Sequence, residues 1–229
     1  MKNLCLFLPL FFFGLSQAQE GEITYRTYAI ETAKKDTDYS KKITREINRM
    51  RFSLLYTKSH SYCFNIQHVP DNRLSANLAL IAAGSPKDWY QDSKQRVSFY
   101  EHKIRGKRYV VLRHDRMQGW ELNNSSKMIE GYQAYKANLK MFNDRTSKYK
   151  LVEAWYSPEL PLPYGPAGFG GLPGLILELR AGPLVYVSEK IIMNPQDGIK
   201  EFIIPSLNNV ISPNELVKLM RANRKVTPD

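Results

Sequence analysis

Cysteine is scarce in this chain. Only Cys5 and Cys63 occur among 229 residues, too few for the disulfide scaffolds that staple small secreted domains. Without the N-terminal segment that holds Cys5, no intramolecular disulfide can form. Core packing alone must therefore hold the domain, and a chain of this size can do so because it buries roughly 70 % of its unfolded surface.

Long apolar runs are confined to the N-terminus. Lys2 precedes an apolar run from Leu4 to Leu15, and the small residues Ser16 and Ala18 follow it. This order predicts a secretory signal peptide over residues 1–18 that is cleaved after Ala18. The run is too short to span a membrane, because about 20 apolar residues are needed to cross the hydrocarbon.

Cys5 lies at the start of that run and not at the cleavage point, which excludes a bacterial lipoprotein anchor. We therefore expect a periplasmic or secreted protein, with a single domain over residues 19–229. No later segment approaches membrane-spanning length, so we expect no transmembrane span in the mature chain.

Acidic residues are fewer than basic ones. The chain has 22 Asp and Glu and 33 Lys and Arg, which gives a net charge of +11. Such a charge favours contact with anionic surfaces. Basic stretches such as Lys103 to Arg108 also occur in nucleic-acid-binding proteins, but export removes that partner, and we expect no nucleic acid. Anionic lipid, lipopolysaccharide or a simply solvated surface fits better.

The chain also has no glycine-rich phosphate loop. Gly168, Gly170 and Gly171 lie within a proline-rich run and do not open a helix. We therefore expect no nucleotide cofactor, and the sequence indicates no other cofactor.

Alternation of apolar and polar residues indicates a β-rich fold. These patterns, with intervening turn residues, predict seven to ten strands with hairpin spacing. The tetrad Asn123 to Ser126 is predicted as a turn. The predicted strands cover residues 22–28, 51–56, 61–67, 97–102, 108–113, 128–134, 149–155, 174–180, 184–189 and 200–204.

Two or three short helices accompany the strands. Residues 33–51 form either a short helix or a solvated loop. Asp71 is predicted to cap a second helix that runs to about residue 83. Ser212, with Pro213 and Glu215 after it, predicts the start of a third. The apolar stripes are Ile43, Ile47 and Met50 in the first helix and Leu74, Leu78 and Ile81 in the second.

Proline and glycine concentrate between Trp155 and Gly174, where they fill ten of twenty positions. A helix or a central strand is excluded there, and the restricted backbone predicts a shaped loop. Its large apolar side chains carry too much area to remain in water. The loop either folds back as a lid over the sheet or lines a pocket.

The sequence around this loop resembles a known family. The residues that carry the resemblance are Ala154 to Pro161, Tyr164 to Pro166, Phe169 and Gly171 to Glu178, with Ile129 to Ala137 upstream. They are similar to the signature of the GLPGLI family, secreted envelope proteins of certain Gram-negative bacteria. The family often carries cysteine where this chain has Ala134, so a thiol role there does not carry over.

The resemblance implies export, a β-rich domain and no established activity. Together with the strand pattern it predicts a mainly β fold: a curved antiparallel sheet or half-open barrel with two or three short helices. The likeness to half-open barrels that carry lipids and lipoproteins rests on layout alone.

Histidines and Cys63 give weak metal or nucleophile patterns. On one strand His60 and His68 would lie about 26 Å apart, at about 3.3 Å per residue, and Cys63 would point to the other face. We expect no metal site, and Cys63 as a buried apolar residue. His102 and His114 could face one another across a hairpin.

Hydrolysis needs a nucleophile and a base. Ser157 is the plausible nucleophile, but it lacks the strand–serine–helix elbow that activates a serine. Glu159 and Glu178 could form an acid and base pair, although an ion pair with Arg180 or another base explains Glu178 better.

The leading hypothesis is an exported binding or accessory protein with a hydrophobic pocket or lid, holding a lipid-like or peptide ligand. The predicted ligand contacts are Trp155, Tyr156, Tyr164 and Phe169, because aromatic residues on a rigid loop supply contact area at low entropic cost. Two alternatives stay open: an envelope hydrolase, such as a peptidase, and an interaction partner of an outer-membrane transporter.

Overall fold

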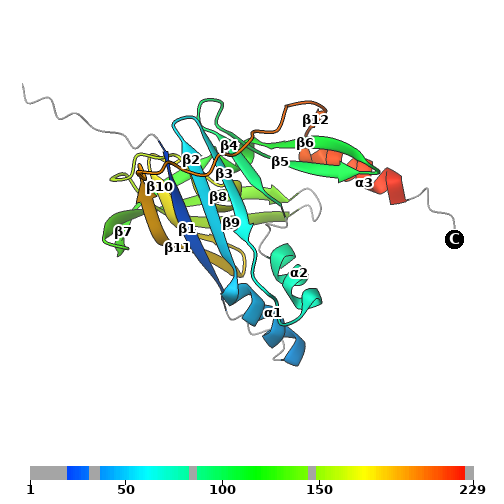
Figure 1. Ribbon diagram of the computed structural model, residues 1–229, viewed down its shortest axis with the longest axis horizontal. Helices are drawn as coiled ribbons and strands as arrows, with labels where there is room; N and C mark the ends of the chain where they lie inside the picture. The colour runs from blue at the N-terminus through cyan, green and yellow to red at the C-terminus, as the bar shows by residue number, and fades with distance from the viewer. Residues whose placement is uncertain (1–19, 31–36, 83–86, 144–147, 225–229) are drawn as a thin grey trace, which may run out of the picture.

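The protein is built on one large sheet. The computed structural model describes residues 20–30, 37–82, 87–143 and 148–224. Twelve strands form the sheet in the order β12-β6-β5-β4-β3-β2-β1-β11-β10-β9-β8-β7 (Figure 1). All pairs are antiparallel except β12 with β6. The sheet has two free ends, β12 and β7, and the predicted curved sheet with a few short helices is confirmed.

The strands are β1 (Glu20–Ala29), β2 (Arg51–Thr57), β3 (His60–Ile66), β4 (Trp89–Asp92), β5 (Val97–Ile104), β6 (Lys107–Arg113), β7 (Trp120–Ile129), β8 (Tyr132–Asn143), β9 (Lys148–Ser157), β10 (Leu175–Ala181), β11 (Leu184–Met193) and β12 (Val210–Ile211). The helices are α1 (Asp38–Arg49), α2 (Arg73–Ala82) and α3 (Pro213–Arg224), with 3-10 turns η1 (His114–Arg116) and η2 (Pro166–Gly168).

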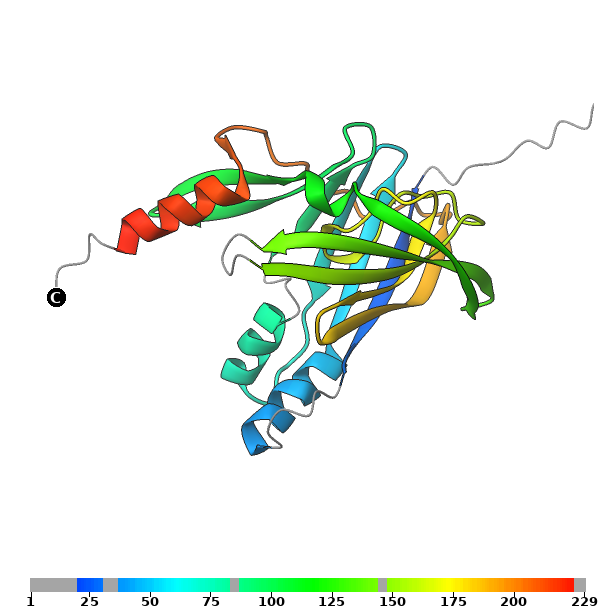
Figure 2. The same ribbon diagram turned by 180° about the vertical axis from the view of Figure 1, so that it is seen from behind.

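The proline- and glycine-rich segment fills the inner side of the sheet (Figure 2). We call residues 158–174 the plug. Tyr164 is fully buried, and Leu160, Phe169 and Leu172 are almost so. Polar atoms of the plug bond to the sheet and to one another. Gln91 Nε2 donates to the Phe169 carbonyl at 2.8 Å, the Tyr164 hydroxyl donates to the Thr57 carbonyl at 3.2 Å, and Gly171 N donates to the Pro163 carbonyl at 2.9 Å. The plug is therefore part of the core, because its polar groups find partners without water.

The helices begin at side-chain caps. A capping box joins Thr37 and Ser40 at α1, so the helix alternative for this region is the correct one. Glu215 accepts from the backbone N–H of Ser212 at 2.7 Å at the start of α3, as predicted. The cap of α2 was predicted as Asp71 and is instead Asn72, whose Oδ1 accepts from Ser75 N at 3.0 Å.

Asp71 is occupied elsewhere, since it pairs with Arg49 at 2.6 Å. The predicted stripe of α2 lies largely outward: Leu74 and Ile81 are 59 % and 62 % exposed, whereas Ser75 and Ala79 are buried. Small side chains thus let α2 approach the rest of the molecule closely.

Two strand predictions and one turn prediction are wrong, and one strand was not predicted. Residues 128–134 contain a hairpin turn, because Glu130 and Gly131 both take positive φ and separate β7 from β8. The tetrad from Asn123 is not a chain reversal but lies inside β7, where the register shifts between Leu122 and Ser126. Residues 200–204 form no strand, and the short β4 was not predicted.

The segment between β11 and β12, residues 194–209, has no regular structure, and we call it the strap. It runs from β11 to β12 past the ends of β2, β3 and β4 (Figure 1). The ring of Phe202 stacks on Tyr62 with centroids 5.7 Å apart, and Ile203 is 88 % exposed. The strap therefore lies on the surface.

Candidate functional site

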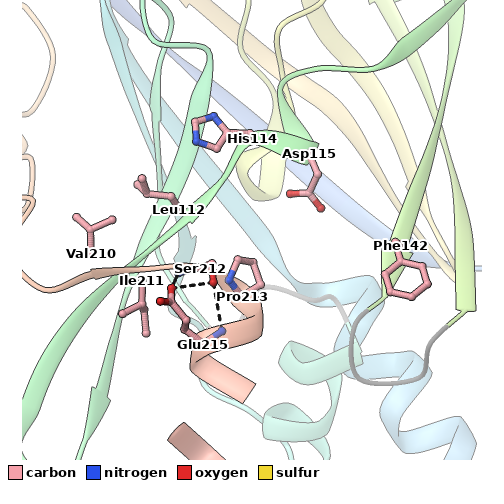
Figure 3. Close-up of a pocket in the computed structure, with 9 residues that line it drawn as sticks. All are labelled: Leu112, His114, Asp115, Phe142, Val210, Ile211, Ser212, Pro213 and Glu215. Atoms are coloured by element: carbon pink, nitrogen blue, oxygen red, sulfur yellow. Dashed lines mark hydrogen bonds between the residues drawn. The ribbon is translucent and has the colours of Figure 1, made fainter. Parts of the chain in front are cut away.

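A pocket of about 490 Å³ lies where the open sheet would have to close. One wall comes from β6, η1, β12 and the start of α3, at one end of the sheet, and Phe142 of β8 stands across from it (Figure 3). Its volume falls within the range of small-molecule sites. The lining residues are Leu112, His114, Asp115, Phe142, Val210, Ile211, Ser212, Pro213 and Glu215.

Most polar groups of this pocket already have partners. Asp115 accepts from Nε and Nη2 of Arg113 at 2.7 and 2.6 Å. Glu215 accepts from Ser212, and these hydrogen bonds lower the pKa of its carboxyl group. The pocket therefore offers a ligand apolar walls together with the exposed imidazole of His114.

Arg116, the last residue of η1, is held between two aromatic rings. Its guanidinium carbon lies 3.9 Å from the ring centre of Trp89 and 4.5 Å from that of Phe169 in the plug. Nη1 donates to the carbonyl of Ala167. These contacts fix the plane of the guanidinium against the plug.

Two lysines approach the same inner region. Lys87 lies 4.2 Å from the ring centre of Tyr100, which packs edge-on against Trp89, and it contacts Nδ1 of His102. Lys150 of β9 lies near the turn between β10 and β11, because a Cβ placed on Gly182 would be 3.4 Å from its Nζ. We call Lys87, Trp89, Tyr100, Arg116 and Phe169 the Arg116 cluster.

Burial makes these cations less basic. It lowers the pKa of Lys87 to about 8, and burial with the nearby charge of Arg113 lowers the pKa of Arg116 to about 9, so both are charged at neutral pH. Burial and the charge of Arg116 lower the pKa of Lys150. Within the described ranges no carboxylate forms an ion pair with Arg116 or Lys150.

Two buried donors of the cluster have no partner among the described residues: Nε of Arg116 and Nε1 of Trp89. The side chain of Trp89 is only 3 % exposed. Unpaired buried donors are rare and costly in folded proteins, so each calls for an explanation.

The four predicted ligand contacts do not meet. Tyr156, Tyr164 and Phe169 are buried on the inner side, with Tyr164 packed 6.2 Å from Tyr56. Trp155 lies on the opposite face of the sheet, where Lys127 stands 4.4 Å from its ring centre. That these four residues bind a ligand stays a prediction, and of the four only Phe169 belongs to the Arg116 cluster.

The histidine and cysteine candidates are dispersed. His60 faces Asp92 at 3.5 Å, and His68 contacts the buried Glu46 at 3.0 Å. Cys63 is fully buried as predicted, and burial raises the pKa of its thiol to about 12. His102 and His114 do not meet, because His102 pairs with Tyr109 in the hairpin register while His114 lies on η1. Across the described segments no three metal-ligating side chains gather.

The geometry gives the hydrolase alternative no support. Ser157 is fully buried, and its hydroxyl has no partner in the part of the chain that the structure describes. Glu178 forms an ion pair with Lys127 at 2.7 Å, so the predicted ion pair exists, with Lys127 as the base. Glu159 instead accepts from Gln133 N at 2.9 Å.

A second pocket of about 420 Å³ lies beside the strap. It is lined by Glu20, Thr57, His60 and strap residues from Gly198 to Ile204. No helix within the described residues is both long and apolar enough to cross a membrane.

Sequence reasoning missed Arg116, Trp89 and Lys150. These residues are separate in the sequence, and each by itself looks like an ordinary charged or aromatic position. Only the plug, which brings Phe169 and Ala167 to η1, gives Arg116 its contacts with an aromatic ring and a carbonyl there.

Comparison with known proteins finds structures with a similar fold and a family of unknown function. A family described as a protein of unknown function (Porph_ging) matches residues 140–178, which overlap the segment that resembles the GLPGLI family. Two crystal structures of PNGF-II, in space groups C2 and P21, are similar at 17 % identity over 89 % of this chain, with TM-scores of 0.53 and 0.52.

This chain spans about a third of the PNGF-II chain, 32 % and 33 % in the two structures. At that identity the likeness shows the fold alone. No curated protein matches the sequence.

Proposed function

We propose that this chain is an exported, envelope-associated binding protein whose ligand occupies the pocket between β6, η1, β8 and α3. The observation that supports it is the pocket itself: about 490 Å³, largely apolar, at the opening between the two ends of the sheet. Small-molecule sites are typically apolar hollows with a few polar groups that set orientation.

Export is supported by the apolar run after Lys2 and the small residues at Ser16 and Ala18. N-terminal sequencing of the protein recovered from cell envelopes tests it. A chain that starts at Gln19 supports cleavage after Ala18, and a chain that keeps Met1 contradicts export.

The ligand class is lipid-like or peptide. The plug already fills the inner side with Leu160, Tyr164 and Leu172, so a long apolar ligand has no room there unless the plug moves. The pocket instead offers Leu112, Phe142 and Ile211 for an acyl chain or an apolar side chain.

Native mass spectrometry of protein purified from its own envelope, followed by lipid and peptide extraction, tests binding. We expect a bound species that Phe142→Ala reduces strongly, because this ring forms one wall of the pocket. Leu151→Ala is the matched control, since Leu151 is 64 % exposed and lies outside the lining. Absence of any ligand from the wild type would contradict the proposal.

Trp155→Ala tests the prediction from the sequence. Loss of the bound species in this variant, with the fold intact, would place the ligand on the opposite face of the sheet. Retention of the ligand leaves the pocket as the site.

A further inference from the structure

Arg116 presents a free pair of parallel donors. Its Nη1 is bonded to the carbonyl of Ala167, which leaves the edge formed by Nε and Nη2 without a partner among the described residues. A guanidinium edge of this kind matches the two oxygens of a carboxylate. The sandwich between Trp89 and Phe169 holds this edge in a fixed plane.

Two other arginines of this chain use the same Nε and Nη2 atoms to bind a carboxylate. Arg51 donates from Nε and Nη2 to the two carboxylate oxygens of Glu189, at 2.7 and 3.2 Å. Arg113 donates from the same two atoms to Asp115, at 2.7 and 2.6 Å. Arg116 is the one of the three that has no carboxylate partner among the described residues.

A second unpaired donor belongs to the ring that packs on this guanidinium. The indole ring of Trp89 lies directly against the guanidinium, and its Nε1–H is buried without an acceptor within the described residues. The other two tryptophans have acceptors: Trp120 donates to the Gly170 carbonyl at 2.8 Å, and Trp155 donates to Glu153 at 3.2 Å. The indole N–H of Trp89 is therefore the exception among the three.

The surrounding charge is positive. Lys150 lies on the same side of β9 as the buried Val152 and Ala154, and the charge of Arg116 contributes to lowering its pKa. It forms no ion pair across the described ranges, and Asp115, the nearest acid in sequence to Arg116, is paired with Arg113. The walls are aromatic, and burying a doubly charged phosphate among them costs more than burying a singly charged carboxylate. The arrangement thus favours one planar, singly charged acid.

We propose that the inner side of the sheet carries a carboxylate-binding site, in which Nε and Nη2 of Arg116 and Nε1 of Trp89 donate to the anion and Lys150 adds a second positive charge. The site is separate from the pocket of the proposed function and does not depend on it. The carboxylate comes from either a fatty acid or the C-terminus of a peptide.

The indole N–H signals in a ¹H–¹⁵N spectrum test the site directly. Trp89→Phe, Trp120→Phe and Trp155→Phe assign the three signals. The probes are hexanoate for the fatty acid, N-acetyl-dialanine for the peptide C-terminus, inorganic phosphate, and hexanol as the neutral control. We expect saturable movement of the Trp89 signal with hexanoate or the peptide, while the Trp120 and Trp155 signals stay in place.

Variants sharpen the result. Arg116→Lys keeps the charge but loses the parallel donors, and we expect about tenfold to hundredfold weaker binding. Lys150→Met, whose side chain makes no described hydrogen bond, is expected to weaken binding severalfold without loss of fold. The matched control is Lys200→Met in the exposed strap.

Each outcome of these titrations either supports the carboxylate site or contradicts it. A Trp89 signal that no probe moves overturns the site. Equal movement with phosphate or with hexanol overturns its assignment to carboxylates. A preference for hexanoate over the peptide, or the reverse, identifies the source of the acid. If Arg116→Lys fails to fold, the Lys150→Met titration still tests the site.

Discussion

The plug and the strap are both irregular segments with proline and glycine, yet they lie in opposite environments. The plug is buried on the inner side of the sheet, where Leu172 is 2 % exposed, whereas Ile203 of the strap is 88 % exposed. The plug bonds its backbone to Gln91 and to Arg116 on the inner side, whereas the backbone of the strap bonds to the sheet at its two ends, through Asn194 to Glu20 and through Asn209 to Val110. The comparison teaches that a non-repetitive segment joins a core when its backbone polar groups find partners there.

The largest expected difference between the plug and the strap is the loss of stability when an apolar side chain is shortened to alanine. Leu172→Ala should lower the free energy of unfolding by about 2–5 kcal/mol, because it leaves a cavity in a close-packed core. Ile203→Ala should change it by no more than about 0.5 kcal/mol, since water already surrounds the side chain. Urea unfolding monitored by circular dichroism measures both. Equal losses in the two variants would break the contrast between plug and strap.

Glycine substitution sharpens the comparison at matched backbone geometry. Gly171 in the plug and Gly198 in the strap have φ of +79° and +70°. A Cβ at Gly171 would collide with the carbonyl of Met117, whereas one at Gly198 would meet only Glu20 Oε1 at 3.4 Å. Gly198→Ala should cost about 1–2 kcal/mol from the left-handed conformation alone, and Gly171→Ala clearly more. Thermal unfolding of both variants measures the difference, and similar melting temperatures would contradict it.

A lysine on the inner side and a lysine in the strap are also expected to affect the pH dependence of stability differently. Lys87 has a pKa of about 8 in the folded protein against its ordinary 10.5, because burial penalises its charge. Between these values the unfolded chain binds the additional proton, so this group makes the free energy of unfolding rise with pH. The groups that face it are His102 and Tyr100 of β5, and burial together with the charge of Lys87 also lowers the pKa of His102.

We therefore expect the wild type to gain stability from about pH 8 to about pH 10 relative to Lys87→Met. Lys200→Met in the strap is the control and should follow the wild type. Urea unfolding across this range measures the slopes. A variant at position 87 with the wild-type slope would contradict the prediction.

The smallest effect is expected at Lys150. Burial and the charge of Arg116 disfavour its ammonium group, and no acid within the described residues compensates. Lys150→Met should raise the free energy of unfolding by less than about 1 kcal/mol, because solvent screens part of the repulsion. Lys200→Met should leave it unchanged. A loss of stability in Lys150→Met would show that this lysine holds the fold instead of serving a ligand.

Local patterns anticipated most of the strands. The hairpin through Gly106 and the turn at Gly182 are where the sequence places them, because alternation and turn residues act within a few positions. The errors also have local causes. A positive φ at Glu130 divides one expected strand into two, and the residues expected to form a turn after Leu122 form an irregularity in the register of β7 instead.

The candidate site was far less predictable. The sequence marked four aromatic residues between positions 155 and 174, in β9 and the plug, and the structure buries three of them. Phe169 reaches Arg116, but Trp155 faces away, since strict alternation in β9 sends it to the other side from Tyr156. Which face becomes the inner one depends on contacts between residues far apart in the chain.

The sequence by itself determined a β-rich chain, a capped C-terminal helix at Ser212 and a rigid apolar segment before β10, because periodicity, capping and proline restriction are local properties. Only the tertiary structure decided that this segment fills the sheet, that Arg116 lies between Trp89 and Phe169, and that a pocket opens between the ends of the sheet. Burial and unpaired donors arise from surroundings assembled by long-range packing, and no short stretch of sequence contains those surroundings.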